Sequence, residues 1–441
     1  MSFLRAAMLA AAFASLATAA SAAPVLMISI DGLRPADVSD AGARGLQIPV
    51  LRKLAADGMS ASGVRNGLPT VTYPNHTTLI TGVWPSRHGI ADNAVFDPKL
   101  QNMGGWYWYA RDIKVPTLWD VVHASGGKVA SLSWPVSVGA AAIDYNIPEY
   151  WRAGNDEDIK LLQALSTPGL IEEMQTATGI SLAEVHGESV AADTARLSYA
   201  AGIIAAHHPQ FTSVHLSALD HIEHDAGPGS ARANAALENL DHAIGDAIEA
   251  ARIAQPDLVV AIVSDHGFAP VEHQVNLLAP FIQAGLITLN ADGQITDWQA
   301  EPWGGASAAV ILADPGNDAV KAKVKTLLDG LAARPELGIA QVIDAPAIAK
   351  LGGTPMASYW IDFKPGYTMG NAPSKPAVSP AAEKGTHGYF PTHREMRATF
   401  ILEGPGVAKK SLGEIDMRDI APTLAKVMSV SLPGADGKPL Y

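Results

Sequence analysis

Long hydrophobic runs recur along the chain, and three of them end at an aspartate. The first run, PVLMISI, is continuously apolar and is followed by an Asp-Gly pair, which is typical of a buried strand that ends in a turn. The runs FTSVHLSALD and DLVVAIVSD have the same character. The pattern therefore predicts three buried strands that end at Asp31, Asp220 and Asp265.

Segments with helical spacing alternate with these strands. The predicted helices cover residues 48–59, 189–206 and 231–254. A polar loop, HIEHDAGPGS, precedes the last of them, and the C-terminal region adds another buried strand, ATFILEGPGV, and a closing helix. Helices that alternate with buried strands indicate an α/β fold with a doubly wound, mostly parallel sheet flanked by helices.

Two long segments lack this regular alternation. Residues 94–187 contain an aromatic cluster at 106–109 and show poor periodicity, so we predict insertion and loop material over the core. Residues 270–380 are rich in glycine and proline, and we predict a second insertion that forms a smaller αβ lobe capping the functional site.

The composition is that of a large globular protein. Of 441 residues, 48% are hydrophobic and 17% are charged, which allows a large core and excludes a disordered or fibrous chain. The formal net charge of −13 argues against a nucleic-acid scaffold and against an anionic membrane surface, because both require basic patches. The chain has no cysteine, which excludes disulfides, thiolate zinc sites and a cysteine nucleophile.

Residues 1–22 are predicted to be a secretory signal peptide. Arg5 is followed by an apolar run and by the small-residue series Ala-Ser-Ala, so we predict cleavage after Ala22. The alternative is an uncleaved anchor helix, but the run is short and rich in alanine. We therefore expect the mature protein to begin at Ala23, to have no membrane anchor and to be periplasmic or secreted.

The three predicted strand ends would bring their aspartates together, because ligands of open α/β sheets bind outside the carboxyl ends of the strands. One Asp-Gly turn alone is ordinary turn chemistry. Three ionised carboxylates, however, repel one another and raise one another's pKa unless cations lie between them. Histidines stand close to two of the three aspartates in sequence, and this mixture of ligands favours zinc or a similar divalent ion.

The stretch 67–93 is crowded with hydroxyls, imidazoles and amides around one Pro-Asn-His turn. Pro74 suits the first turn of a helix that continues to Gly82, so a threonine just before it would lie at the helix N-terminus. The free N–H groups and the helix dipole favour an anion there, such as a phosphate or an alkoxide. The candidate nucleophiles or capping residues are Thr70, Thr72, Thr77, Thr78 and Thr81.

Taken in order, the motifs ISIDG, PTVTYPNH, HGIADN, DHIEHDAGP, SDHG and GTHGY resemble those of the nucleotide pyrophosphatase/phosphodiesterases of the alkaline phosphatase superfamily. The resemblance covers nearly the whole chain after the predicted signal peptide. It implies an alkaline phosphatase-like fold and an exported bacterial member of the family. It also implies one metallo-phosphodiesterase catalytic domain over residues 23–441, with the two insertions near 94–187 and 270–380.

The resemblance implies a role for each matching residue. The nucleophile falls on Thr72, just before the Tyr-Pro-Asn-His turn. The first metal ion would be held by Asp220, His224 and His387. The second would be held by Asp31, Asp265 and His266, with Thr72 completing its ligands. The implied cofactors are two zinc ions per subunit.

The resemblance also implies contacts with the substrate. Asn93 would donate its amide to a phosphoryl oxygen, helped by the backbone N–H of Tyr73. The Tyr73 ring stands where the family usually has a phenylalanine that stacks on a base, and Tyr150 or Trp151 would supply the other face of that stack. Phosphomonoesterases of the superfamily typically hold the phosphate with an arginine, whereas an amide donor suits a singly charged diester.

Several other polar residues near these motifs are predicted to be structural. His76 and His88 match no ligand position, and we expect each to make structural hydrogen bonds. His215 lies along a predicted strand, and neither it nor His221 is assigned to a metal. Arg87 is predicted to be solvated rather than to clamp a phosphate.

The implied activity is hydrolysis of phosphodiester or pyrophosphate bonds in nucleotides such as ATP, dinucleotides or NAD, with release of a nucleoside 5′-monophosphate. Thr72 would form a covalent phosphothreonine-type intermediate that water then cleaves. One alternative is a related hydrolase of phosphonates, phosphocholine-type diesters or phosphomonoesters. Another is a periplasmic metal- or phosphate-binding module without catalysis. The expected partner is a small molecule rather than a nucleic acid, and no oligomeric state is predicted.

Overall fold

A computed structural model describes residues 22–441 except 153–154, 156, 371 and 373. All of the predicted signal peptide except Ala22 lies outside these described residues. Within them, no helix combines the length and the apolar character that crossing a membrane requires.

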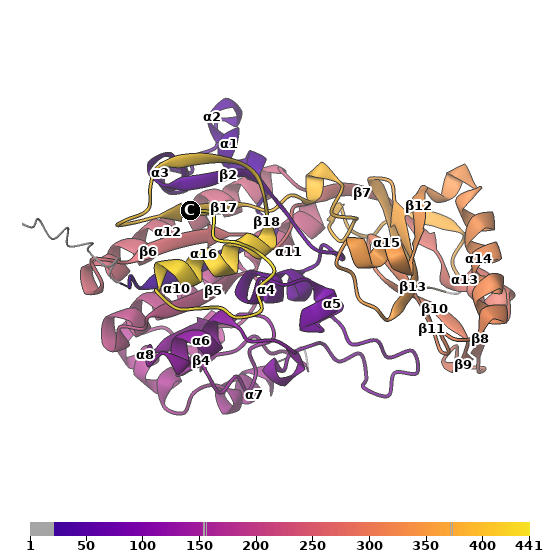
Figure 1. The fold of residues 1–441 in the computed structure, drawn as a ribbon, viewed down its shortest axis with the longest axis horizontal. Coiled ribbons are helices and arrows are strands. Elements are labelled where there is room, and N and C mark those ends of the chain that lie inside the picture. Colours follow the sequence, from indigo (N-terminus) through magenta and orange to yellow (C-terminus); the bar gives the residue numbers. More distant parts are fainter. Residues whose placement is uncertain (1–21, 153–154, 156, 371, 373) are drawn as a thin grey trace, which may run out of the picture.

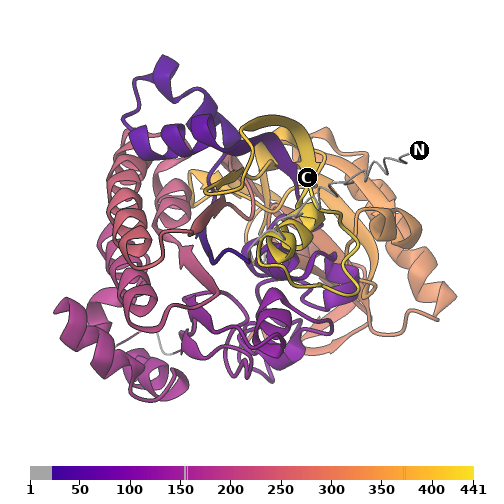
Figure 2. The same cartoon turned by 60° about the vertical axis from the view of Figure 1, so that its left-hand side comes forward.

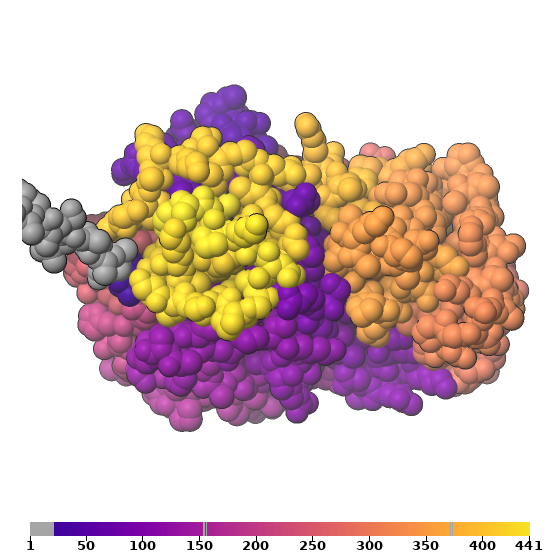
Figure 3. Space-filling model, in the orientation of Figure 1, coloured from indigo at the N-terminus to yellow at the C-terminus, as the bar shows by residue number. Residues whose placement is uncertain are grey.

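The chain forms a large sheet-centred body and a smaller lobe, drawn in orange, beside it (Figure 1). In the space-filling view, the N-terminal third of the chain and the C-terminal segment lie against each other over the larger body (Figure 3).

The main sheet has eight strands in the order β18-β2-β17-β6-β1-β5-β3-β4. Their bounds are β18 (Lys410–Asp416), β2 (Met59–Arg65), β17 (Phe400–Glu403), β6 (Val259–Val263), β1 (Val25–Ile30), β5 (Phe211–Leu216), β3 (Val129–Leu132) and β4 (Tyr145–Ile147). β1 pairs in parallel with β5 on one side and with β6 on the other. Only β17 among these strands is antiparallel to its neighbours, so the predicted mostly parallel sheet is confirmed.

Helices cover both faces of this sheet because the side chains of its central strands are apolar on both sides. In β1, Leu26, Ile28 and Ile30 join one buried cluster, and Val25 and Met27 join the other. The first face is covered by α3 (Pro49–Asp57), α8 (Leu170–Thr178), α10 (Val190–His207) and α12 (Ala231–Ala254). Figure 2 shows α10 and α12 side by side as long magenta-to-pink helices. The second face is covered by α4 (Thr72–Thr81), α6 (Leu118–Ala124) and α16 (Ile420–Val427).

The segment between β6 and β17 builds most of the smaller lobe. Its four-stranded sheet has the order β10-β11-β13-β12, with bounds β10 (Ala300–Gly304), β11 (Ser307–Leu312), β13 (Ala357–Phe363) and β12 (Ile339–Asp344). A second small sheet joins β7 (Ala269–Asn276) to β14 (Gly366–Gly370), β15 (Val378–Pro380) and β16 (Gly385–Thr386). The helices of the lobe are α13 (Leu278–Gln283), α14 (Asp318–Ala332) and α15 (Ala345–Lys350). The predicted αβ character of this segment is therefore present.

Short elements connect these larger ones. They are α1 (Pro35–Ser39), α2 (Ala41–Arg44), α5 (Pro85–His88), α7 (Glu157–Leu165), α9 (Leu182–Val185), α11 (Ala218–Ala226), β8 (Ile287–Leu289) and β9 (Ile295–Trp298). One of them, α11, carries two of the predicted metal ligands.

The predicted strand ending at Asp220 is wrong in its last four residues. β5 ends at Leu216, and Asp220 lies in the first turn of α11. The chain turns into this helix because the backbone N–H groups of Ser217 and Ala218 donate to the Asp193 carboxylate at 3.2 and 2.9 Å. The predicted polar loop after Asp220 accordingly begins as a helix, which ends at Gly227 with φ 86°.

The segment 94–187 differs from its prediction as loop material over the core. It supplies β3 and β4, which complete one edge of the main sheet by parallel pairing with β5 and with each other. Four- and three-residue strands are too short to show a clear period in the sequence. Likewise, α4 begins at Thr72 rather than at Pro74, so Thr72 is the first helical residue instead of the residue before the helix.

Candidate active site

Three aspartates meet at the carboxyl end of the central strands. Asp31 directly follows β1, Asp265 comes two residues after β6, and Asp220 projects from the first turn of α11. The parallel pairing of β1 with β5 and β6 places these three connections next to one another. The predicted convergence of the aspartates is therefore observed, although α11 rather than β5 carries Asp220.

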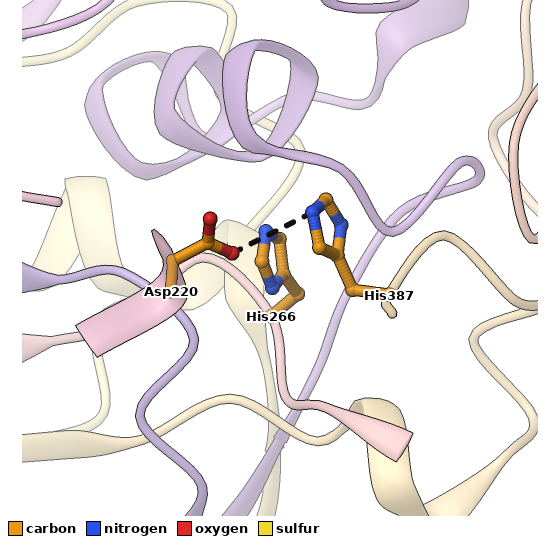
Figure 4. Close-up of side chains that lie close together, drawn as sticks. All are labelled: Asp220, His266 and His387. Atoms are coloured by element: carbon orange, nitrogen blue, oxygen red, sulfur yellow. Dashed lines mark ion pairs between the residues drawn. The ribbon is translucent and has the colours of Figure 1, made fainter. Parts of the chain in front are cut away.

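Two overlapping groups of possible metal ligands form around these aspartates. In each group, one ligand atom per residue lies within 4.8 Å of the others, and the groups are Asp31, Asp265 and His266, and Asp220, His266 and His387. His224 stands beside the second group, with Nε2 3.5 Å from Asp220 Oδ2. Figure 4 shows Asp220, His266 and His387 pointing toward one another. The structure thus brings together all six aspartates and histidines that were predicted to hold metal.

The three histidines at the site are oriented alike. The Nδ1 atoms of His224, His266 and His387 each lie 3.1 Å from a backbone carbonyl oxygen, of Gly385, Gly267 and Thr70 respectively. A carbonyl only accepts, so each Nδ1 carries the ring proton. In each ring Nε2, the nitrogen left to bind a metal ion, is directed at the aspartates. This is the orientation in which imidazoles bind metal ions in proteins.

The aspartates at the site hold oxygens with no hydrogen-bond partner among the described residues. These oxygens are Asp31 Oδ1, Asp220 Oδ1 and Asp265 Oδ2. Asp265 Oδ2 lies 3.0 Å from His266 Nε2, but not in hydrogen-bonding geometry. Buried oxygens without partners are costly unless a ligand satisfies them. The donor set of carboxylates and imidazoles therefore fits divalent cations such as zinc.

The electrostatics of the site are those of crowded, desolvated groups. Burial, together with the charges of Asp265 and Asp220, raises the pKa of the Asp31 carboxyl well above its usual value. Burial and the neighbouring His266 and His224 lower the pKa of His387 well below its usual value. His387 is therefore neutral, which is the form of histidine that binds a metal ion. For His224, burial is outweighed by Glu383 and Asp220, which raise its pKa to about 9.

Thr72 lies at the edge of these groups. Its hydroxyl Oγ1 is 3.4 Å from His266 Nε2. The other four candidate threonines instead donate to backbone carbonyls: Thr70 to Tyr389, Thr77 to Tyr73, Thr78 to Pro74 and Thr81 to Thr77, at 2.7, 2.8, 3.1 and 2.7 Å. Of the five candidates, Thr72 is therefore the one whose hydroxyl faces the candidate metal ligands, and it does so from the N-terminus of α4.

Comparison with known proteins agrees with this arrangement. The family model described as type I phosphodiesterase / nucleotide pyrophosphatase matches residues 25–390, which include Thr72 and all six candidate metal ligands. The chain belongs to this family. The predicted resemblance is therefore confirmed, and the alkaline phosphatase-like fold with it.

Relatives of this phosphodiesterase-family chain are longer proteins. Ectonucleotide pyrophosphatase/phosphodiesterase family member 1 of Rattus norvegicus is 27% identical over 260 residues, covering 55% of this chain and 24% of the relative. The venom phosphodiesterase of Naja atra is 24% identical over 258 residues, covering 56% and 26% respectively. The matched part of the chain thus spans about a quarter of the length of these relatives.

Solved structures share the fold over almost the whole chain. Human ectonucleotide pyrophosphatase/phosphodiesterase 5 has a TM-score of 0.65 at 18% identity, with 94% of this chain and 97% of that chain covered. The murine protein, solved as an inactive variant in complex with AMP, has a TM-score of 0.64 at 18% identity, with the same coverage. At this identity, the likeness shows the fold alone.

The aromatic residues depart from the pattern expected of the family. The Tyr73 ring is fully buried, its hydroxyl donates to Glu149 Oε1 at 2.7 Å, and Trp106 packs edge-on against it at 5.2 Å. The predicted stacking of Tyr73 on a base does not agree with the structure, because the ring has no exposed surface. Tyr150 is half-buried with its ring 5.0 Å from Trp108, and Trp151 is 36% exposed.

Asn93 and Tyr73 contact each other. The backbone N–H of Tyr73 donates to Asn93 Oδ1 at 2.8 Å, so the two predicted donors to a phosphoryl oxygen are linked. An asparagine that accepts through its oxygen still has two N–H donors. Asn93 is thus fixed beside the first turn of α4, close to Thr72.

The residues predicted to be structural have structural contacts. His76 Nδ1 lies 2.9 Å from the Thr72 carbonyl oxygen, and His88 Nε2 lies 3.2 Å from Thr78 Oγ1, so both predicted hydrogen-bonding roles are confirmed. Burial lowers the pKa of His76 to about 4 and that of His88 to about 3, so both rings are neutral. Arg87 donates to the Gly434 carbonyl at 3.0 Å and pairs with Asp436.

The contacts of two residues at the site, the buried His215 and the partly buried Glu149, were not predicted from the sequence. His215 lies on β5 with Nε2 2.9 Å from Asp31 Oδ2 and Nδ1 2.8 Å from Glu149 Oε2. A histidine within an otherwise apolar strand that leads to the site was a usable signal for His215. Glu149 had no such signal, because it stands in an aperiodic stretch far from every motif.

Proposed function

We propose that this protein hydrolyses phosphodiester or pyrophosphate bonds of nucleotides and releases a nucleoside 5′-monophosphate. The observation that carries the proposal is the position of Thr72: its hydroxyl faces His266 Nε2 at 3.4 Å from the N-terminus of α4, beside both ligand groups. Family membership and the AMP complex of the murine structural neighbour support a nucleotide substrate.

We further propose two metal ions, with zinc as the metal. The first would be held by Asp220, His224 and His387, and the second by Asp31, Asp265, His266 and Thr72. When bound, two zinc ions supply the positive charge that favours a threonine alkoxide and stabilises charge developing on the phosphoryl oxygens. The three Nδ1-protonated histidines and the three unpartnered carboxylate oxygens support this assignment.

The chain's own residues account for the covalent steps. The Thr72 hydroxyl gives its proton to solvent, Oγ1 attacks phosphorus and forms the Oγ1–P bond, and the P–O bond to the leaving group breaks with its electron pair going to the leaving oxygen. The positive end of the α4 dipole and the amide N–H donors of Asn93, whose Oδ1 already accepts from the Tyr73 N–H, would stabilise the negative charge that develops. Water then attacks phosphorus from the opposite side and restores the hydroxyl. Two inversions give net retention of configuration at phosphorus.

A diester substrate is favoured over a monoester by the donors beside Thr72. Asn93 offers neutral amide donors, which suit one negative charge, whereas a monoester carries two near neutral pH. Arg87 is held by Asp436 and the Gly434 carbonyl in the C-terminal segment, so its guanidinium is already engaged away from Thr72. These contacts support the prediction that Arg87 does not clamp the phosphate.

The test is turnover of bis-p-nitrophenyl phosphate against p-nitrophenyl phosphate by the zinc-loaded mature protein, followed by ATP, a dinucleotide and NAD with product analysis. We expect a preference for the diester and release of nucleoside 5′-monophosphate. A preference for the monoester would contradict the proposal, and activity on phosphonates or phosphocholine diesters alone would favour the related-hydrolase alternative. Metal binding without any hydrolysis would favour the other alternative, a metal- or phosphate-binding module without catalysis.

We also propose that the protein is exported. The basis is the sequence of residues 1–22, most of which lie outside the described residues. N-terminal sequencing of the protein from a secreting host is expected to begin at Ala23. A protein that retains Met1 would contradict export by cleavage.

A further inference from the structure

We propose that a chain of four side chains, Tyr73–Glu149–His215–Asp31, which is buried except at the partly exposed Glu149, positions Asp31 for metal binding. His215 stands at its centre, with Nε2 2.9 Å from Asp31 Oδ2 and Nδ1 2.8 Å from Glu149 Oε2. The Tyr73 hydroxyl closes the chain by donating to Glu149 Oε1 at 2.7 Å. The inference deepens the proposed function, on which it rests for the role of Asp31 as a ligand.

His215 differs from the candidate ligand histidines in what its two nitrogens face. Each of those three places Nδ1 3.1 Å from a backbone carbonyl oxygen and directs Nε2 at the aspartates of the site, and in His224 Nδ1 also lies 3.2 Å from Glu383 Oε2. In His215 both nitrogens face carboxylate oxygens, which only accept hydrogen bonds. Both nitrogens therefore donate, the ring has no lone pair to offer, and His215 is a positioning residue rather than a further metal ligand.

The bond from His215 leaves Asp31 with one oxygen for a metal ion. Asp31 Oδ2 is held by His215, whereas Oδ1 has no hydrogen-bond partner among the described residues and lies 3.3 Å from His266 Nε2. The carboxylate is thus fixed in rotation before an ion arrives. A partner that orients a ligand in this way raises the affinity of the site, because less conformational freedom is lost on binding.

The chain also ties this ligand to the start of α4. Tyr73 directly follows Thr72, and its buried ring cannot leave without breaking the hydroxyl bond to Glu149. Glu149 comes from the segment 94–187, which packs β3 and β4 onto β5 beside His215. Three separate parts of the sequence therefore hold Asp31 and the first turn of α4 in one arrangement.

The test uses three variants, His215→Asn, Glu149→Gln and Tyr73→Phe, and a matched control, Tyr199→Phe. Tyr199 lies on α10 and is also fully buried, and its hydroxyl donates to the Ile180 carbonyl at 2.7 Å. Each protein is loaded with zinc and mixed with the chromogenic chelator 4-(2-pyridylazo)resorcinol without substrate, and the release rate of each ion is followed. Circular dichroism compares the folds of the variants.

We expect His215→Asn to release one of its ions about 10–100-fold faster than the unaltered protein, the usual effect of removing a residue that orients a ligand. The release rate from Glu149→Gln is expected to lie between those of His215→Asn and the unaltered protein. Tyr73→Phe should release the ion slightly faster than the unaltered protein, and Tyr199→Phe should release it at the unaltered rate. The Tyr73→Phe and Glu149→Gln changes remove the same hydrogen bond. The double variant should therefore raise the release rate by a factor smaller than the product of the two single-variant factors.

Release of both ions at the unaltered rate from His215→Asn and Glu149→Gln would overturn the proposal. Multiplicative effects in the Tyr73→Phe, Glu149→Gln double variant would also overturn it. The result does not depend on turnover, so it is distinct from failure of the proposed function. A protein that binds zinc without cleaving diesters would refute the phosphodiesterase assignment, and the release rates would still decide whether His215 orients Asp31.

Discussion

The two groups of candidate metal ligands differ in depth. Side-chain exposure is 4%, 0% and 0% for Asp31, Asp265 and His266, but 17%, 26% and 10% for Asp220, His224 and His387. The deep group comes from the ends of β1 and β6 in the main sheet. The shallow group joins α11 to the loop after β16, where the main sheet meets the smaller lobe.

If both groups bind metal as proposed, this difference predicts two kinds of metal site. The deep group is fixed by the parallel sheet and by hydrogen bonds from Gly32 N to Asp265 and from His215 to Asp31, at 3.3 and 2.9 Å. The shallow group depends on two segments that approach from different sides, and its His224 also faces the exposed Glu383 at 3.2 Å. We therefore expect tight, slow binding at the deep group and weaker, exchangeable binding at the shallow one.

The largest expected effect contrasts ligand loss in the two groups. Asp265→Asn and His224→Gln each remove a proposed ligand, and both should lower kcat/KM by more than the roughly 10–100-fold typical of residues that only orient a ligand. Excess zinc should restore much of the His224→Gln activity but little of that of Asp265→Asn, because a solvent-facing site can recruit water as a substitute ligand. If excess zinc restored the activity of both variants equally, the predicted difference between the deep and the shallow group would be wrong.

A second contrast uses the unaltered protein. Dialysis against increasing chelator should remove one ion well before the other, measured as metal per chain by elemental analysis. Loss of both ions should also lower the melting temperature, because an ion at a hundredfold excess over its Kd stabilises the folded state by about 2.7 kcal/mol. Release of both ions in one step would argue that the groups form a single cooperative site.

A third contrast concerns the loop that carries His387. Thr70 accepts from Gly388 N at 3.1 Å and donates to the Tyr389 carbonyl at 2.7 Å, while its own carbonyl receives His387 Nδ1–H. Thr70→Val removes the hydroxyl. We expect diesterase activity to fall about tenfold, because the shallow group would bind its zinc ion less tightly.

The control for this change is Thr81→Val. The Thr81 hydroxyl is equally buried, but it donates to the Thr77 carbonyl at 2.7 Å and accepts from Val83 N at 3.5 Å, so its bonds stay within α4 and the turn that follows it. It should leave the diesterase rate and the zinc release rates unchanged. If both valine variants lose activity equally, the effect of Thr70 lies in general packing rather than in the His387 loop.

The smallest expected effect is that of Arg87→Ala. The Arg87 side chain is 44% exposed and pairs with Asp436, so its loss should cost at most about 1 kcal/mol of folding free energy. Diesterase kcat/KM should stay within twofold of the unaltered value. A large fall in activity, measured with bis-p-nitrophenyl phosphate, would show that Arg87 contacts the phosphate after all.

Much of the fold and of the ligand set could be predicted from the sequence. Continuous apolar runs marked β1, β5 and β6, and helical spacing marked α12 at its observed bounds. The candidate ligands follow those strands directly or stand in short motifs with their neighbours. Local sequence patterns are informative wherever a long buried element fixes the residues that come after it.

The remaining features depend on contacts between distant segments. Asp220 lies in a helix because Asp193, far away in α10, caps the backbone at Ser217 and Ala218. The Tyr73 hydroxyl is bonded to Glu149, which no local pattern connects to it. Polar pairs of this kind have no period, so the hydrogen bonds that determine them appear only once the chain is folded.

The most direct test of the account is to trap the covalent intermediate on Thr72. The zinc-loaded protein is mixed with a nucleotide diester, quenched in acid within milliseconds, digested and analysed by mass spectrometry. We predict a nucleoside monophosphate adduct on the peptide that contains Thr72, and no adduct with Thr72→Ala, which should also lose diesterase activity. An adduct on another residue, or undiminished turnover by Thr72→Ala, would contradict the account.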